Sequence, residues 1–220
     1  MRESGQLPLP FVHRPEFVDD LLQAASNENA LAWSSRPQDW PGGRLAIWGA
    51  EGCGKTHLLH LWAGRIGARY RCGAALRAEM PATGLAIDDA DAVPDAAVLL
   101  HTLNAAAEAR LPVLLAARQP PGRWPIELPD LASRLRATMA VEIGPAEDTL
   151  LQALFARLLS ERQIAVSACV QDWIRLRLPR TPAALREAAA RLDHAGLVAG
   201  RAITRALAAA VLGQLADRDC

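Results

Sequence analysis

The chain has 220 residues, of which 51% are hydrophobic, and it carries 24 lysines and arginines against 24 aspartates and glutamates. This length suits one α/β domain with a smaller companion, and the apolar content is enough to build a sizeable core. The net charge of zero argues against a domain that binds nucleic acid by electrostatic attraction alone.

The cysteines and the N-terminus indicate where the protein works. Cys53, Cys72, Cys169 and Cys220 have no Cys-x-x-Cys spacing, which favours intracellular thiols over a disulfide framework. The start of the chain has neither an apolar signal segment nor a small-residue cleavage site, and no apolar stretch of about 20 residues occurs. We therefore expect a cytoplasmic protein that does not cross a membrane.

The elements up to residue 145 alternate in the way that a parallel sheet requires. Residues 1–15 contain three prolines and no apolar periodicity, which predicts an extended tail. A helix is expected after Ser26-Asn27, which can cap it, and the Pro37–Gly43 stretch ends it. Within 16–145 we expect strands at 44–48, 69–72, 84–88, 112–117 and 139–143, with helices ending near Gly67 and spanning 95–110. This pattern predicts a doubly wound α/β core.

Gly49 to Thr56 read Gly-Ala-Glu-Gly-Cys-Gly-Lys-Thr, a complete phosphate loop of the form G-x-x-x-x-G-K-[S/T], directly after the first strand. Its backbone N–H groups curl around phosphates, Lys55 reaches the β and γ phosphates, and the Thr56 hydroxyl can ligate magnesium. We therefore expect ADP or ATP with Mg²⁺. The candidate nucleotide-binding residues are Gly49, Glu51, Gly52, Cys53, Gly54, Lys55, Thr56 and His57.

The segment Gly84-Leu85-Ala86-Ile87-Asp88-Asp89 is an apolar strand that ends in two carboxylates. A carboxylate at this place can hold magnesium directly or through water, while its neighbour orients the attacking water. Asp88 is therefore the candidate metal ligand beside Thr56, and Asp89 is the candidate catalytic carboxylate.

A third polar segment, Leu128-Pro129-Asp130-Leu131-Ala132-Ser133-Arg134-Leu135-Arg136, precedes the last strand of the α/β core. An arginine presented by a neighbouring subunit can stabilise charge on a transferring phosphate. A surface arginine at the end of a helix is the alternative, and spacing alone does not choose between them.

After Gly144-Pro145 the apolar period becomes helical. Leu150, Leu154 and Leu158 form one row beside a second row of Leu151, Phe155 and Leu159. Further helices are expected at about 167–178, 182–195 and 203–215, with Thr181 as a cap and Pro182 in the first turn of the middle one. Residues 146–220 are therefore expected to form a small all-helical lid domain.

These segments together resemble the DnaA and Hda family of AAA+ proteins over about residues 6 to 212. The resemblance is carried by Trp48 to His60, which extends the phosphate loop with His57-Leu58-Leu59-His60, by Ile87-Asp88-Asp89, and by Leu128 to Leu135. The Leu-Pro-Asp-Leu-Ala-Ser-Arg-Leu run is shared with the shorter, Hda-type members. The resemblance implies an AAA+ module with a helical lid. It also implies that Arg134 is the finger that reaches into a neighbour's nucleotide site.

The resemblance also implies a role for the tail. The peptide Gln6-Leu7-Pro8-Leu9-Pro10-Phe11 is similar to the family's N-terminal peptide, which docks on the DNA polymerase III sliding clamp, the β subunit. Gln6 can hydrogen-bond at the edge of a pocket, Leu7, Leu9 and Phe11 supply apolar anchors, and the prolines reduce the entropy lost on binding.

The chain departs from the family's initiators in three places. It ends at Cys220 without the helix-turn-helix domain that reads origin DNA, so we expect no direct sequence-specific DNA binding. Arg118 stands where the initiator has an acidic polar sensor, and Ala183 stands near the place of the lid's sensor arginine, for which Arg180 and Arg186 are alternatives. These changes affect intrinsic hydrolysis more than nucleotide binding, and we expect weak or absent ATPase activity.

The resemblance thus implies a negative regulator of replication initiation that binds the sliding clamp and stimulates hydrolysis of DnaA-bound ATP. Two alternatives stay open at this level. One is a self-sufficient AAA+ ATPase of the helicase-loading or remodelling type, and the other is a truncated initiator that acts at origin DNA. Whether the chain carries ADP or ATP, and whether it forms a homodimer, is also open.

Overall fold

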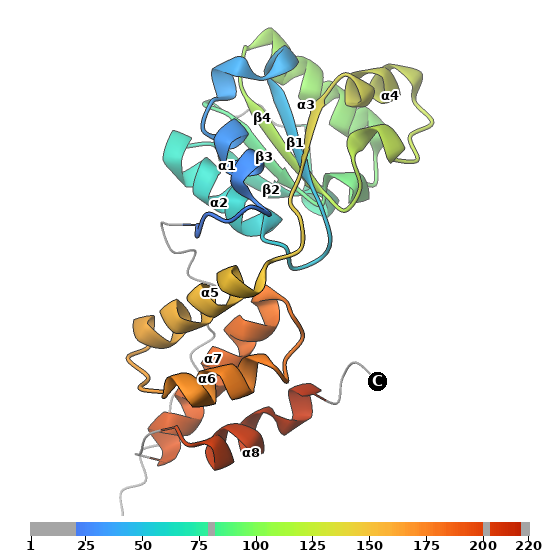
Figure 1. The fold of residues 1–220 in the computed structure, drawn as a ribbon. Coiled ribbons are helices and arrows are strands. Elements are labelled where there is room, and N and C mark those ends of the chain that lie inside the picture. The colour runs from blue at the N-terminus through green and yellow to red at the C-terminus, as the bar shows by residue number, and fades with distance from the viewer. Residues whose placement is uncertain (1–20, 79–81, 200–202, 217–220) are drawn as a thin grey trace, which may run out of the picture.

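The computed structural model describes residues 21–78, 82–199 and 203–216. Figure 1 shows an α/β core in the upper part of the picture and a cluster of helices in the lower part, joined by the segment after the last strand. The predicted fold class, a parallel-sheet α/β core followed by a helical lid, is confirmed.

The sheet contains five parallel strands in the order β2-β3-β4-β1-β5. They are β1 (Arg44–Trp48), β2 (Arg69–Cys72), β3 (Leu85–Asp88), β4 (Val113–Ala117) and β5 (Met139–Glu142), so every predicted strand is present. Because β1 lies between β4 and β5, the carboxyl ends of three strands meet where the phosphate loop begins. Ligands of open α/β sheets bind at this edge.

Helices cover both faces of the sheet. The helices α1 (Glu28–Ser34) and α2 (Lys55–Ile66) lie on one face, while α3 (Ala96–Glu108) and α4 (Pro129–Arg136) lie on the other. Successive strand residues point to opposite faces, so Leu45 and Ile47 join the α1–α2 layer and Ala46 joins the α3–α4 layer. Strands buried on both sides need continuous apolar sequence, and the sequence supplies it.

The start of α1 differs from the expectation. Asn27 is the N-cap residue, but its side chain bonds the preceding turn, where Oδ1 accepts from Ala24 N at 2.9 Å and Nδ2 donates to Leu22 O at 2.9 Å. Ser26 bonds a distant residue instead of the helix, with its N and Oγ donating to the Glu147 carboxylate at 2.6 and 2.8 Å. The segment before α1 is therefore tied to the junction between core and lid.

The lid contains α5 (Asp148–Glu161), α6 (Ala168–Arg175), α7 (Pro182–Ala199) and α8 (Arg205–Ala216). Its core includes the predicted row of Leu151, Phe155 and Leu159, while Leu154 packs at the edge. Thr181 Oγ1 accepts from Ala184 N at 3.2 Å, as a cap does. The expected boundary after residue 145 falls in the short segment between β5 and α5, and the expected tail lies outside the described residues.

One glycine controls the end of β3. A Cβ added to Gly73 would lie 2.2 Å from the carbonyl oxygen of Asp89, so Gly73→Ala is expected to displace that strand end. We expect the free energy of unfolding to fall by about 1–3 kcal/mol. Gly64→Ala is the matched control, because Gly64 is exposed within α2 and a Cβ there meets no atom within 4 Å. Denaturant titration of both variants checks this, and an equal effect of the two would contradict it.

Candidate nucleotide-binding site

The phosphate loop connects the carboxyl end of β1 to α2, at the junction of the core with the lid (Figure 1). Gly52 has φ 78° and Gly54 has φ 109°, conformations that residues with a side chain rarely adopt. A Cβ added to Gly49 would lie 2.3 Å from the carbonyl oxygen of Ile143. These glycines therefore allow the tight curl that turns backbone N–H groups toward a bound phosphate.

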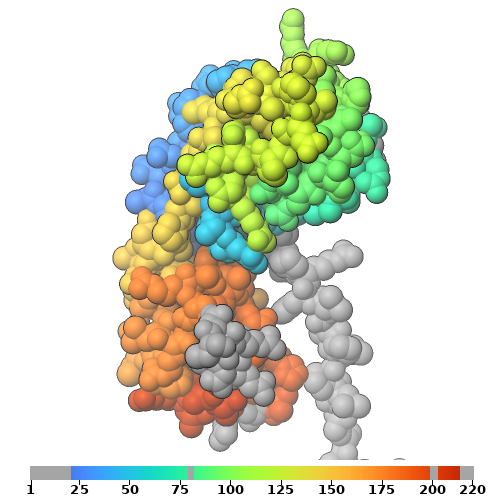
Figure 2. Space-filling model, turned by 90° about the vertical axis from the view of Figure 1, so that its right-hand side faces the viewer, coloured from blue at the N-terminus to red at the C-terminus, as the bar shows by residue number. Residues whose placement is uncertain are grey.

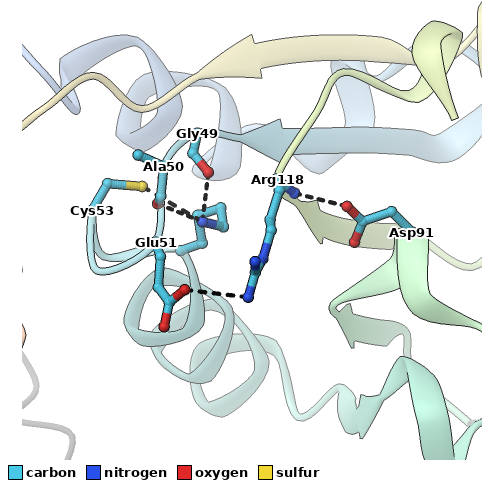
Figure 3. A network of polar contacts seen from close by, with 7 residues as sticks. Gly49, Ala50, Glu51, Cys53, Asp91 and Arg118 are labelled. Atoms are coloured by element: carbon cyan, nitrogen blue, oxygen red, sulfur yellow. Dashed lines mark hydrogen bonds and ion pairs between the residues drawn. The ribbon is translucent and has the colours of Figure 1, made fainter.

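Lys55 points back into the curl of the loop. Its Nζ donates to the carbonyl oxygens of Gly49 and Ala50, both at 2.8 Å, and lies 3.8 Å from Cys53 Sγ. Figure 3 shows Gly49, Ala50 and Cys53 around these contacts. The lysine is 7% exposed, so its charge lies inside the cradle that the loop forms. A buried ammonium beside a helix N-terminus fits the phosphates of a nucleotide.

Asp88 is buried and oriented at the carboxyl end of β3. Its Oδ2 accepts from the Tyr70 hydroxyl at 2.9 Å and its Oδ1 accepts from Asp89 N at 3.1 Å. Tyr70 in turn stacks on His60 of α2, with ring centroids 3.9 Å apart. Burial and the bond to Asp88 raise the pKa of Tyr70 above its ordinary value, so the phenol stays a donor. The sequence pattern gave no signal for Tyr70, which lies inside an unremarkable strand.

Asp89 has the left-handed backbone φ of 46° and lies among several charges. Burial raises its pKa, the carboxylates of Asp88 and Asp91 add to this, and the cations Arg118 and Lys55 act in the opposite direction. The structure therefore brings the predicted residues Lys55, Asp88 and Asp89 together at one edge of the sheet.

The residues present fit a magnesium ion only together with phosphate oxygens. Thr56 is exposed in the first turn of α2, and the Asp88 carboxylate has lone pairs left after its two hydrogen bonds. Among the residues that the structure describes, no group of three or more histidines, cysteines, aspartates and glutamates could hold a metal by itself. Magnesium is commonly held in this way, by one or two protein ligands plus phosphates and water.

Arg118 extends from the end of β4 toward the phosphate loop, as Figure 3 shows. Its Nη2 lies 3.2 Å from Glu51 Oε2, and its backbone N donates to Asp91 Oδ2 at 3.0 Å. An arginine therefore stands at the place where the initiators that the sequence resembles have an acidic polar sensor. It pairs with a residue of the loop itself, which the sequence did not indicate.

The lid contacts the phosphate loop from the other side. In Figure 2 the light-blue region that contains the loop lies directly against the orange lid. A Cβ added to Gly52 would lie 3.5 Å from Thr181 Cβ, just before α7. Of the two arginines considered for the lid sensor, Arg180 pairs with Asp148 at 2.7 Å, whereas Arg186 is near enough to His57 to lower its pKa. Of these two arginines, Arg186 is therefore the one whose charge acts on His57, at the end of the phosphate loop.

His57 makes the contact between core and lid sensitive to acid. Burial, followed by the charges of Arg186, His60 and Arg157, lowers the pKa of His57 to about 4. The unfolded chain takes up this proton near pH 6.5 and the folded chain only near pH 4, so stability is lost as the pH falls between these values.

We expect the free energy of unfolding to fall from pH 7 to pH 4.5 by roughly 1–3 kcal/mol more in the wild type than in His57→Gln. His101→Gln is the control, because His101 is exposed on α3 and should leave the pH profile of the wild type unchanged. Denaturant titration at both pH values measures the free energy of unfolding of each variant. An equal loss between pH 7 and pH 4.5 in the wild type and in His57→Gln would contradict the expectation.

Arg134 lies far from the phosphate loop of its own chain. It is in the last turn of α4, and its carbonyl oxygen accepts from Thr138 Oγ1 at 2.9 Å. Thr138 Oγ1 also accepts from Arg44 Nε at 3.4 Å, and Arg44 is the first residue of β1. The phosphate loop begins at the other end of this five-residue strand, about 15 Å away. Arg134 is therefore the one predicted site residue in the described ranges that the structure does not bring to the site.

The remaining predicted residues, Gln6, Leu7, Leu9 and Phe11, lie outside the described residues. Within the part of the chain that the structure describes, no helix is both long and apolar enough to span a membrane.

The chain matches no protein-family model and no curated protein, but many solved structures are similar to it. Domain III of the Thermotoga maritima replication initiation protein DnaA is 17% identical with a TM-score of 0.76, covering 92% of this chain and 98% of that one. AMPPCP-bound DnaA from Aquifex aeolicus is 16% identical with a TM-score of 0.68, covering 84% of this chain and 67% of that one. The Thermotoga maritima RuvB Holliday junction branch migration motor is 18% identical with a TM-score of 0.63, covering 86% and 69%.

The last two coverages mean that the chain spans about two thirds of the length of those longer structures. Sequence identities this low establish the fold of the chain and do not establish its function. The function has to be argued from the geometry of the candidate site. The sheet order and the helices that follow it are those of an AAA+ module with its lid, and this is the fold to which the chain belongs.

Proposed function

We propose that this chain is a nucleotide-binding regulator that pairs with the replication initiator DnaA and stimulates hydrolysis of the ATP that DnaA holds. The observation that carries the proposal is the separation of Arg134 from its own phosphate loop by the length of β1. An arginine so placed can act on a nucleotide only in a neighbouring molecule. Within the described residues the Arg134 guanidinium has no hydrogen bond or ion pair, which leaves its donors for such a neighbour.

Arg134 would supply two things to the partner's nucleotide. Its planar guanidinium donates to oxygens of the terminal phosphate, and its fixed charge offsets the negative charge that grows there during phosphoryl transfer. Thr138 orients the end of α4 by donating to the Arg134 carbonyl. The product is ADP-bound DnaA, so the chain would act as a negative regulator of initiation.

The chain's own site would hold ADP or ATP and serve as a conformational control. Lys55 would release the Gly49 and Ala50 carbonyls and donate to phosphate oxygens, while Thr56 and Asp88 would hold magnesium. Magnesium supplies charge neutralisation when it is bound. Thr181 lies close to Gly52 of the loop and Arg186 acts on His57, which supports a nucleotide that sets the angle of the lid.

Two observations support the proposed partners. The similarity to DnaA domain III over 98% of that chain supports DnaA, because modules of one fold can replace each other in a shared arrangement. The tail peptide at residues 6–11 supports the sliding clamp, because one polar residue, Gln6, is followed by the apolar anchors Leu7, Leu9 and Phe11 with prolines between them. Recruitment to the clamp would concentrate the chain where replication has begun.

The test is hydrolysis of DnaA-bound ATP, measured with and without this protein and with and without clamp loaded on DNA. We expect stimulation only when both are present. An unchanged rate would overturn DnaA as the partner. Changing Gln6, Leu7, Leu9 and Phe11 to alanine should abolish both clamp retention and stimulation, and a variant that still binds the clamp would overturn the docking role of the tail.

The intact set of Lys55, Asp88 and Asp89 favours a second candidate function, a self-sufficient ATPase. This function requires turnover by the purified protein without DnaA or clamp. The turnover should disappear in Lys55→Ala and in Asp89→Ala. Absence of turnover in the wild type would leave the regulator as the better account.

A further inference from the structure

Tyr70 holds one oxygen of the Asp88 carboxylate from the neighbouring strand. Tyr70 of β2 lies opposite Ala86 of β3, and Asp88 follows Ala86 by two residues on the same face of the sheet. A long side chain can reach such a diagonal neighbour, and the Tyr70 hydroxyl donates to Asp88 Oδ2 at 2.9 Å. The pairing of the two strands therefore brings this hydroxyl to the candidate magnesium ligand.

The Asp88 carboxylate is held at both of its oxygens. Its Oδ1 accepts from Asp89 N at 3.1 Å, and Asp88 is only 5% exposed, so solvent can hardly replace the Tyr70 hydroxyl at Oδ2. Without a second donor the group could turn, because the last torsion of an aspartate has only broad minima. The bond from Tyr70 fixes the plane of the carboxylate, and each oxygen keeps a lone pair for a metal ion.

The ring of Tyr70 is itself held by α2. His60 stacks on this ring, with ring centroids 3.9 Å apart and an angle of 24° between the planes. His60 closes the His57-Leu58-Leu59-His60 extension of the phosphate loop, one turn along the helix from His57. The extension therefore carries a contact that supports the end of β3, in addition to the contact of His57 with the lid.

We propose that Tyr70 is a positioning residue for the magnesium site: its hydroxyl aims the Asp88 carboxylate at the ion that accompanies the nucleotide, and His60 keeps the phenol in place. Carboxylates that bind a metal are commonly oriented by such a hydrogen bond, and its loss weakens metal binding by about 10- to 100-fold. The hydroxyl acts through Asp88 and makes no contact with the ion or the nucleotide.

This role rests on the proposed nucleotide site, and calorimetry with AMPPCP in magnesium chloride and in EDTA separates the two. In the wild type we expect magnesium to strengthen the binding of AMPPCP. Tyr70→Phe keeps the ring and removes only the hydroxyl. We therefore expect the strengthening to fall by as much as about 10-fold, while the dissociation constant in EDTA changes by less than about 2-fold. A merely structural role would weaken binding in both solutions.

Asp88→Asn shows whether the hydroxyl acts through Asp88. If it does, Tyr70→Phe causes no further loss of the magnesium effect in the Asp88→Asn background. The control is Thr102→Val, which removes another buried hydroxyl, one that donates to Val98 O at 2.8 Å within α3. Because α3 covers the other face of the sheet, this variant should keep the magnesium effect of the wild type.

The stack on Tyr70 has its own pair of variants. His60→Ala removes the ring that holds the phenol, and we expect the magnesium effect to fall about 3-fold. His60→Phe supplies a ring again and should recover most of this loss.

Each outcome decides one part of the proposal. An equal magnesium effect in the wild type and in Tyr70→Phe, or a further loss from Tyr70→Phe in the Asp88→Asn background, overturns the positioning role. Equal losses in His60→Ala and His60→Phe overturn the role of the stack. A wild type that binds AMPPCP equally well in both solutions overturns the magnesium site, and one that binds in neither overturns the nucleotide site itself.

Discussion

Replacing Arg134 by alanine is expected to return hydrolysis of DnaA-bound ATP to the rate of DnaA alone, a loss of as much as about 1,000-fold in the stimulated rate. The chain's own nucleotide affinity should not change, because Arg134 and the phosphate loop lie at opposite ends of β1. The two measurements together separate a trans-acting arginine from one that supports the fold.

The control for Arg134 is its neighbour on the same helix. Arg136 is also in the last turn of α4 and is exposed, so Arg136→Ala removes an equal charge from the same region. Arg134→Lys should recover only part of the stimulation, because an ammonium lacks the planar fork. Full stimulation by Arg134→Ala would exclude the finger role, and equal losses from Arg134→Ala and Arg136→Ala would reduce it to a general effect of charge.

The second large effect is expected from Lys55→Ala, which should weaken binding of ADP and AMPPCP by about 100-fold. The Lys55 ammonium is almost fully buried and lies within 2.8 Å of two carbonyl oxygens at the start of the loop. Its removal deletes the charge that attracts the phosphates and leaves those carbonyls without their donor.

Arg65→Ala controls for the loss of charge on α2, because Arg65 is exposed in the last turn of the same helix. Calorimetry with ADP measures both variants. A change of less than about 3-fold for Lys55→Ala would mean that the loop does not bind phosphate. Unimpaired stimulation of DnaA by a Lys55→Ala protein that has lost its nucleotide would mean that the chain's own nucleotide does not control pairing.

The sequence was sufficient for features that depend on short segments. The central strands β1 and β4 follow from apolar runs such as Leu45 to Trp48, because residues buried on both faces are mostly apolar. The phosphate loop follows from its glycines and Lys55, whose spacing is fixed by backbone geometry. The lid followed from the four-residue spacing of its leucines.

Contacts between distant segments could not be predicted in this way. Ser26 was expected to cap α1, but it bonds Glu147, which is 121 residues away in sequence. The pairing of Arg118 with Glu51 likewise depends on β4 lying beside β1, and strand order is not a property of either segment. The pairing of Arg180 with Asp148 and the effect of Arg186 on His57 depend on how α7 is placed, which sequence spacing does not give.

The position of Arg134 at the amino end of β1, with the phosphate loop at the carboxyl end, also has a consequence for symmetry. In the proposed pairing, a contact that joins the amino end of β1 in one molecule to the carboxyl end in another through two different surfaces would be heterologous, and its repetition would give a ring or an open row. A two-fold pairing would instead let each molecule place its arginine on the other's nucleotide, because contacts across a two-fold axis are reciprocal. Only an open row would leave one arginine unused at one end and one nucleotide site without an arginine at the other.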